Sequence, residues 1–221
     1  MNILEEAKAR EAGLIVMGTK GATSSRKLLF GSITTEIILN SDVPVLAIPQ
    51  DSSLKHFKEI SFTTDFHERD LGSLSQIVEL GKLFNSNIRV LHVAEEKSLA
   101  TEIKFRGFRE LVREQFPEAP ITFQMLMDDD FFVGIAEFLA GHPTHLLVMT
   151  RYKKNFWQKM LTRNHSKEMG FYTNVPLLTL VGDSIAPFEM PSRSKKKLKN
   201  NSYVSFALPV KVPAADRSAT R

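Results

Sequence analysis

Apolar residues along the chain occur in two patterns that follow one another, short continuous runs and runs with helical spacing. Continuous runs such as Leu14–Met17 and Val43–Ile48 are typical of strands that are buried on both faces. Apolar positions three and four residues apart, as in Ile33 and Ile37, predict amphipathic helices between the strands. Strands that alternate with helices indicate an α/β protein with a mostly parallel, doubly wound sheet.

The pattern divides the chain into three segments. Residues 1–50 predict a helix, a strand, a loop, a helix and a strand, and a polar linker begins at Pro49. Residues 56–182 predict a complete unit of five strands joined by helices. The expected strands are Ile60–Thr64, Ile88–Val93, Ile121–Met127, Leu146–Met149 and Pro176–Val181, and the expected helices lie near 71–84, 103–116, 131–140 and 166–172. Residues 183–221 lack periodicity and predict a basic, disordered tail.

The first segment repeats the end of the second at an offset of 132 residues. Leu14–Met17 aligns with Leu146–Met149, and Val43–Leu46 aligns with Val175–Leu178, without a gap. We therefore interpret residues 1–50 as the trailing part of one unit, without its first strands and helices, and residues 56–182 as one complete copy. The chain is then expected to be a truncated piece of a longer tandem protein.

Composition narrows the class of protein. The 221 residues are 43% hydrophobic and 24% charged, which is typical of a globular chain. The absence of cysteine excludes disulfides, a thiol nucleophile and an iron–sulfur cluster. No apolar run approaches the ~20 residues that a membrane helix needs, and the first residues do not resemble a signal peptide. We expect a cytoplasmic protein with no membrane partner.

The net charge of +4 does not point to nucleic acid. The segment from Asp183 to Arg221 holds eight Lys or Arg and three Asp or Glu, so the rest of the chain is close to neutral. The sequence argues against nucleic-acid binding except through the Lys195–Lys199 cluster in the tail, for which a solvated tail is the simpler interpretation.

A glycine pattern in the first segment is the strongest candidate for binding chemistry. Gly18 and Gly21 follow a strand, and Gly31 and Ser32 begin a helix nine residues later, giving G-x2-G-x9-G-S. Glycine can adopt positive φ and lets the backbone approach a ligand closely. Free N–H groups at a helix N-terminus favour an anion such as phosphate. A flexible turn with an ordinary serine cap explains the same residues about equally well.

These motifs resemble those of the universal stress protein family. The resemblance rests on Leu14–Gly21, Leu28–Thr34 and Asp42–Leu46 in the first segment, and on Phe62–Phe66 and Val90–Val93 in the second. It implies a flavodoxin-like, adenine nucleotide alpha hydrolase-like sheet of five parallel strands. It also implies ATP as the cofactor, with phosphate and ribose held by the glycine loop and an aspartate of the first strand near the adenine.

The chain departs from the family pattern in both segments. The first segment has the loop residues but no first strand and hence no aspartate. The second has Asp65 as its first-strand aspartate, but its four loop positions are Thr150, Lys153, Arg163 and Asn164. Each segment therefore carries about half of a nucleotide site, and we expect the halves to lie apart.

Other polar clusters have simpler interpretations. Pro143 separates His142 from His145, so a surface loop is favoured over a metal site, and we predict no metal. Asp128–Asp130 are expected to cap a helix, and His67–Asp70 to form a polar turn. Basic and aromatic residues form a loop that could bind phosphate or nucleic acid but is more simply a solvated loop: Arg151, Lys153, Lys154, Phe156, Trp157, Lys159 and Arg163.

Two functions remain open. The first is a non-enzymatic stress-response module with a partial ATP-binding loop in the first segment and none in the second; no catalytic base is evident, although weak ATP hydrolysis stays open. The second is a dimerisation or protein-interaction scaffold that binds no nucleotide. In both, the two copies, or two chains, are expected to pair through Val43–Ile48 and Pro176–Val181.

Overall fold

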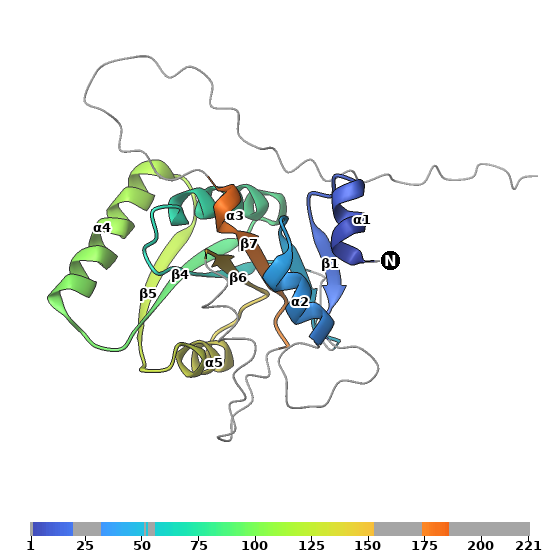
Figure 1. The fold of residues 1–221 in the computed structure, drawn as a ribbon. Coiled ribbons are helices and arrows are strands. Elements are labelled where there is room, and N and C mark those ends of the chain that lie inside the picture. The colour runs from blue at the N-terminus through green and yellow to red at the C-terminus, as the bar shows by residue number, and fades with distance from the viewer. Residues whose placement is uncertain (1, 20–31, 51, 53–55, 153–173, 186–221) are drawn as a thin grey trace, which may run out of the picture. The chain divides into compact units, whose positions relative to one another are not determined.

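The computed structural model describes residues 2–19, 32–50, 52, 56–152 and 174–185 (Figure 1). Met1–Met190 form one compact unit, and its described part contains a seven-stranded sheet. The helix expected near 166–172 and nearly all of the expected tail lie outside the described residues.

The strands are arranged in the order β1-β2-β7-β6-β3-β4-β5. Their bounds are β1 (Ile15–Gly18), β2 (Val45–Ile48), β3 (Glu59–Thr63), β4 (Asn87–Ala94), β5 (Ile121–Met127), β6 (Leu146–Arg151) and β7 (Leu177–Val181). The helices are α1 (Ile3–Ala9), α2 (Ser32–Asn40), α3 (Asp70–Phe84), α4 (Leu99–Gln115) and α5 (Phe131–Gly141), with a 3₁₀ turn at Gly182–Ser184.

The five strands of the second segment form a parallel sheet with β3 at its centre. Ile60 of β3 pairs with Ile88 of β4 and with Leu146 of β6. The chain therefore runs outward from β3 to β4 and β5, and then returns to the other side of β3 for β6 and β7. This order confirms the predicted doubly wound α/β fold.

Helices cover both faces of the sheet. One apolar cluster contains residues of α3 and α4, and another contains residues of α2 and α5. Figure 1 shows α3 and α4 on one side of the central strands and α5 on the other. Strands β6 and β7 lie between these layers, which is why their sequences are continuous apolar runs rather than alternating ones.

The first segment adds β1 and β2 to the sheet with reversed direction. β1 is parallel to β2, and β2 pairs antiparallel with β7 through three residue pairs, with Leu46 opposite Leu178. As a result, the carboxyl ends of β1 and β2 lie at one edge of the sheet, and those of β3, β6 and β7 lie at the opposite edge.

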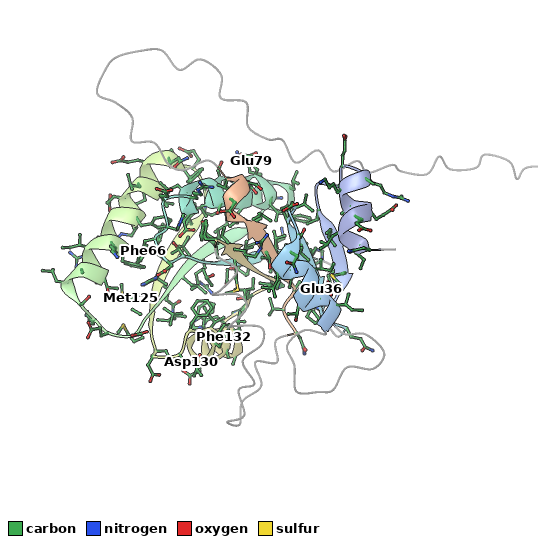
Figure 2. The ribbon with its side chains drawn as sticks, viewed as in Figure 1. Glu36, Phe66, Glu79, Met125, Asp130 and Phe132 are labelled. Carbon is green, nitrogen blue, oxygen red and sulfur yellow. The ribbon has the colours of Figure 1, made fainter. Side chains whose placement is uncertain are left out.

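Helix capping explains where two helices begin. α4 begins at Leu99, four residues before the expected Ile103, because Ser98 Oγ accepts a hydrogen bond from Thr101 N at 3.2 Å. Asp130 lies at the start of α5 (Figure 2) and accepts from the N–H groups of its first turn. This confirms the predicted cap. None of the described helices has the length and apolar character needed to cross a membrane.

Candidate functional site

The beginning of α2 lies beside the end of β1. Thr34, in the first turn of α2, donates its hydroxyl to the carbonyl oxygen of Gly18 at 2.9 Å. The structure therefore brings Gly18 and Ser32, the two ends of the predicted loop, to the same edge of the sheet. Gly21 and Gly31 lie outside the described residues.

Gly18 does not use the backbone freedom that the sequence suggested. None of the described glycines has a positive φ. Gly18 is an extended, exposed residue at the end of β1, where it pairs with Ile48. What glycine contributes at this position is the missing side chain, which leaves the strand end open to close approach.

Thr34 should be important for holding α2 in place. Its side chain is buried, with 3% exposed, and its hydroxyl donates to Gly18 O. Thr34→Val is expected to lower the free energy of unfolding in urea by about 1 kcal/mol, because the part-buried hydrogen bond from its hydroxyl to Gly18 O is lost. Thr35→Val on the next position is the control and should change stability by less than about 0.5 kcal/mol. Equal effects of the two changes would contradict the assigned contact.

Asp65 lies far from Gly18 in the topology of the sheet. It follows β3 by two residues and is exposed. Because β3 is antiparallel to β1, Asp65 is at one edge of the sheet and Gly18 is at the opposite edge. The structure thus keeps the two predicted half-sites apart, as the sequence led us to expect.

A buried carboxylate occupies the carboxyl edge of the second segment. Asp70 is the first residue of α3 and is 1% exposed. Its Oδ2 accepts from Thr64 Oγ1 at 2.5 Å and from His67 N at 3.0 Å. Its Oδ1 accepts from the hydroxyl of Tyr152. Three donors from three places in the chain therefore converge on one carboxylate.

Tyr152 fills the space between the ends of β3, β6 and β7. Its ring stacks on His67 with a centroid distance of 3.8 Å and an interplanar angle of 14°. The ring also lies so close to Gly182 that a Cβ there would overlap it. Its hydroxyl is 3.3 Å from Ser73 Oγ, which also accepts from Thr150 Oγ1 at 2.9 Å. The second segment thus fills this edge with its own side chain.

A second aromatic group lies next to Asp65. Phe66 has a φ of 55°, a left-handed conformation that costs a residue with a side chain about 1–2 kcal/mol. Its ring packs on His92 at 4.1 Å and near Phe108 at 5.8 Å between centroids. Figure 2 labels Phe66 beside α4. These contacts offset the backbone cost and cover the strand ends around Asp65.

Burial shifts the pKa values of Asp70 and Tyr152, which are hydrogen-bonded to each other. Burial raises the pKa of Asp70 above its usual range, against the hydrogen bonds from Thr64, Tyr152 and His67, which lower it. Burial also raises the pKa of Tyr152, and the adjacent Asp70 raises it further. The tyrosine therefore stays protonated at neutral pH and remains the donor to the carboxylate.

The remaining polar candidates have local partners. His142 Nδ1 is 3.0 Å from Phe138 O, and His145 Nδ1 accepts from Glu59 N at 3.0 Å. His67 begins the predicted polar turn, which leads directly into α3. Among the described residues, no cluster of three or more His, Cys, Asp or Glu side chains is arranged to hold a metal ion.

The assignment of Arg151 to a basic loop is wrong. β6 continues two residues beyond the expected Met149, so Arg151 is the last strand residue, and it is 5% exposed. Its Nη2 donates to Ser41 O at 2.5 Å. The other residues of that predicted loop, Lys153 to Arg163, lie outside the described residues.

Sequence reasoning missed the parts of the second-segment site that depend on tertiary contacts. Asp70 was expected only as part of a polar turn, and Tyr152 had no expected role. The only signal in the sequence is a carboxylate three residues after His67 at the start of a helix, which is equally typical of an ordinary helix N-terminus. Burial of Asp70 becomes evident only once β6 is known to end beside β3.

Comparison with known proteins supports the resemblance seen in the sequence. The model of the universal stress protein family matches residues 1–49. A universal stress protein of Methanocaldococcus jannaschii is 44% identical over 46 residues, which are 21% of this chain and 27% of that protein.

Solved structures share the fold over most of the chain. A universal stress protein from Archaeoglobus fulgidus superimposes with a TM-score of 0.60 at 19% identity, covering 80% of this chain and 64% of the other. A functionally unknown protein from Pseudomonas aeruginosa PAO1 gives 0.58 at 18%, covering 82% of this chain and 67% of the other. The chain thus spans less than two thirds of the Archaeoglobus protein and about a quarter of the Methanocaldococcus one.

The fold defines the class: an α/β protein in which the five strands of the second segment form a flavodoxin-like parallel sheet. The first segment is similar in sequence to universal stress proteins over residues 1–49, and the solved structures share the fold of the chain.

Proposed function

We propose that the protein is a non-enzymatic stress-response module of the universal stress protein type, whose first segment binds ATP. The proposed phosphate contacts are Gly18, Gly21, Gly31 and Ser32. One observation carries the proposal: the hydrogen bond from Thr34 to Gly18 holds the first turn of α2 beside the open end of β1, where helix N–H groups can meet an anion. The family match over residues 1–49 covers the same loop.

The second segment has the proposed role of a copy that binds no nucleotide. Tyr152 lies between His67 and Gly182 and is bonded to Asp70, so the space at this edge is filled. In this interpretation the two segments are tandem copies that pair through β2 and β7, and their role is to stabilise each other. A homodimer and a cytoplasmic location stay predictions.

Titration of the full chain with ATP in a calorimeter tests the proposal. The wild-type protein is expected to bind with a dissociation constant in the micromolar range. Gly18→Val should weaken binding about tenfold or more, because the new side chain would block close approach to the strand end.

Gly13→Ala is the matched control for this experiment, since no atom lies within 4 Å of a Cβ placed there. It should bind ATP as the wild type does. Failure of the wild-type protein to bind ATP at millimolar concentration would overturn the proposed ATP site.

A scaffold without a nucleotide is the second candidate function. It is favoured by the filled carboxyl edge of the second segment, where Tyr152 lies against His67 and Gly182 and is bonded to Asp70. If ATP does not bind, this candidate predicts that partner capture or self-association depends on the β2–β7 pairing rather than on the loop.

A further inference from the structure

Helix α2 connects the two candidate sites. Its first turn contacts Gly18 through Thr34, at the carboxyl end of β1. Its last turn leads into β2, and β2 runs antiparallel to β7. The end of α2 therefore lies at the edge of the sheet where β6 and β7 end, so one nine-residue helix has an end near each site.

Arg151 of β6 supplies the cation at this end of α2. Its guanidinium reaches across β7 to Ser41 O, the carbonyl directly after the helix. α2 has no basic residue in its own last turn. A positive charge near the exposed carbonyls of a helix C-terminus is favourable, and here it comes from the second segment.

The turn that receives Arg151 is itself well ordered. Ser41 is 1% exposed, and its Oγ donates to Val43 O at 2.6 Å and accepts from Val43 N at 3.1 Å. Ser41 N donates to Ile37 O at 2.9 Å. A displacement of the Ser41 carbonyl would therefore move the end of the helix rather than be absorbed by a loose connection.

Burying an apolar side chain at this position would cost less free energy than burying arginine. Met149 lies two residues before Arg151 in β6, and Thr179 of β7 pairs with Met149, so both lie on the same face of the sheet as Arg151, and both are buried. Arg151 Nε is buried without a hydrogen-bond partner. Burial lowers the pKa of Arg151, whereas the carboxylates of Asp183 and Asp42 raise it. Arginine is therefore costly to bury at this position, and the hydrogen bond to Ser41 O is the direct contact that its guanidinium makes there.

We infer that Arg151 is a positioning residue for the anion-binding end of α2, so that the second segment contributes to the site of the first. This inference rests on the proposed ATP site for its functional part. Arg151 fixes the C-terminal end of α2, Thr34 fixes the N-terminal end, and together they set the position of the first turn beside the end of β1. Tyr152, the next residue in the chain, fills the candidate site of the second segment. The end of β6 therefore supplies one residue to each of the two candidate sites.

The test compares Arg151→Met and Arg151→Lys in the full chain, with hydrogen exchange and ATP calorimetry as the two measurements. Without ligand, Arg151→Met is expected to speed amide exchange in residues 35–41 about tenfold, while exchange in α3 stays unchanged. It should also weaken ATP binding about fivefold or more. Arg151→Lys keeps the charge but not the planar guanidinium, so it should show the same two changes at a smaller size, about threefold.

Arg89→Met is the matched control. Arg89 lies on β4, away from α2, and also has a buried guanidinium nitrogen without a partner. Arg89→Met removes a comparable cation. Amide exchange in α2 and the affinity for ATP should both stay at the wild-type values. Circular dichroism verifies folding. If Arg151→Met does not fold, the test uses Arg151→Lys, for which faster amide exchange in residues 35–41 and weaker ATP binding are expected at about threefold.

The outcomes separate the inference from the proposed function. Unchanged exchange in residues 35–41 would overturn the positioning role whether or not ATP binds. Faster exchange with ATP affinity within about twofold of wild type would overturn the link to the anion site and leave the proposed function standing. Failure of the wild-type protein to bind ATP would overturn the proposed function and the link between Arg151 and the anion site. Amide exchange in residues 35–41 would then decide by itself whether Arg151 positions α2.

Discussion

Gly182→Ala is expected to lower the free energy of unfolding by about 3 kcal/mol, which is a large effect for one methyl group. A Cβ on Gly182 would overlap the Tyr152 ring and would lie 3.1 Å from Arg151 O. The ring also stacks on His67, with 3.8 Å between the centroids, so displacing the ring disrupts this contact and the hydrogen bond from its hydroxyl to Asp70. Urea denaturation followed by circular dichroism measures the loss.

Gly107→Ala is the control for this prediction. Gly107 lies in α4, and a Cβ there meets no atom within 4 Å. Alanine in a helix interior should raise stability by about 0.5–1 kcal/mol. Equal stability of Gly182→Ala and the wild type would show that the ring does not fill this space.

A double substitution shows whether the two residues act together. If the overlap is the cause, Gly182→Ala should cost little when Tyr152→Ala is already present, because the ring that it would displace is gone. The two single changes should then be strongly non-additive. Additive effects would mean that Gly182→Ala acts through something other than Tyr152.

The strands of the second segment could be predicted because each is a largely apolar run, which is typical of a buried strand, although β5 at the end of the sheet has no fully buried residue. All five residues of β7 are buried, and the sequence at this position is a continuous apolar run. The same argument placed β3, β4, β5 and β6 within one or two residues of their observed bounds. Strand ends were harder to predict: β6 includes Arg151, whose charge suggested a loop, because the contact that allows it to be buried comes from Ser41, 110 positions away in the chain.

The two ends of the first-segment loop could be predicted from the sequence, but the contact between them could not. The glycine and serine spacing identified Gly18 and Ser32 as the two ends of one loop, and the structure brings them together. The contact that does so, from Thr34 to Gly18 O, was not expected, since a buried threonine in a helix has no distinctive pattern. The second-segment site was not predicted because Thr64, Asp70 and Tyr152 come from separate elements that meet only when β3 and β6 are adjacent.

Asp70→Ala is expected to lower the free energy of unfolding by about 3–4 kcal/mol. The carboxylate accepts from Thr64 Oγ1, His67 N and the Tyr152 hydroxyl, and alanine would leave these buried donors without an acceptor. Asp70→Asn has the same shape. Its oxygen can accept from Thr64 and His67, and its amide can donate to the Tyr152 oxygen. It should stay within about 1 kcal/mol of wild type at pH 7.

The pH dependence of the same pair of proteins tests the environment of Asp70 independently. Burial raises the pKa of Asp70 in the folded protein above its value of 3.8 in the unfolded chain, so the folded protein holds this proton more tightly. The stabilisation is therefore fully present below pH 3.8 and is lost as pH rises through the folded pKa. Asp70→Asn has no such proton, so its stability does not depend on this titration. As pH rises from 3.8 through the folded pKa, the wild type should therefore lose stability relative to Asp70→Asn. Above the folded pKa the difference between the two proteins should stay constant. A difference that is flat, or that shifts toward the wild type as pH rises, would mean that the hydrogen bonds outweigh burial and that the carboxylate is held as an anion.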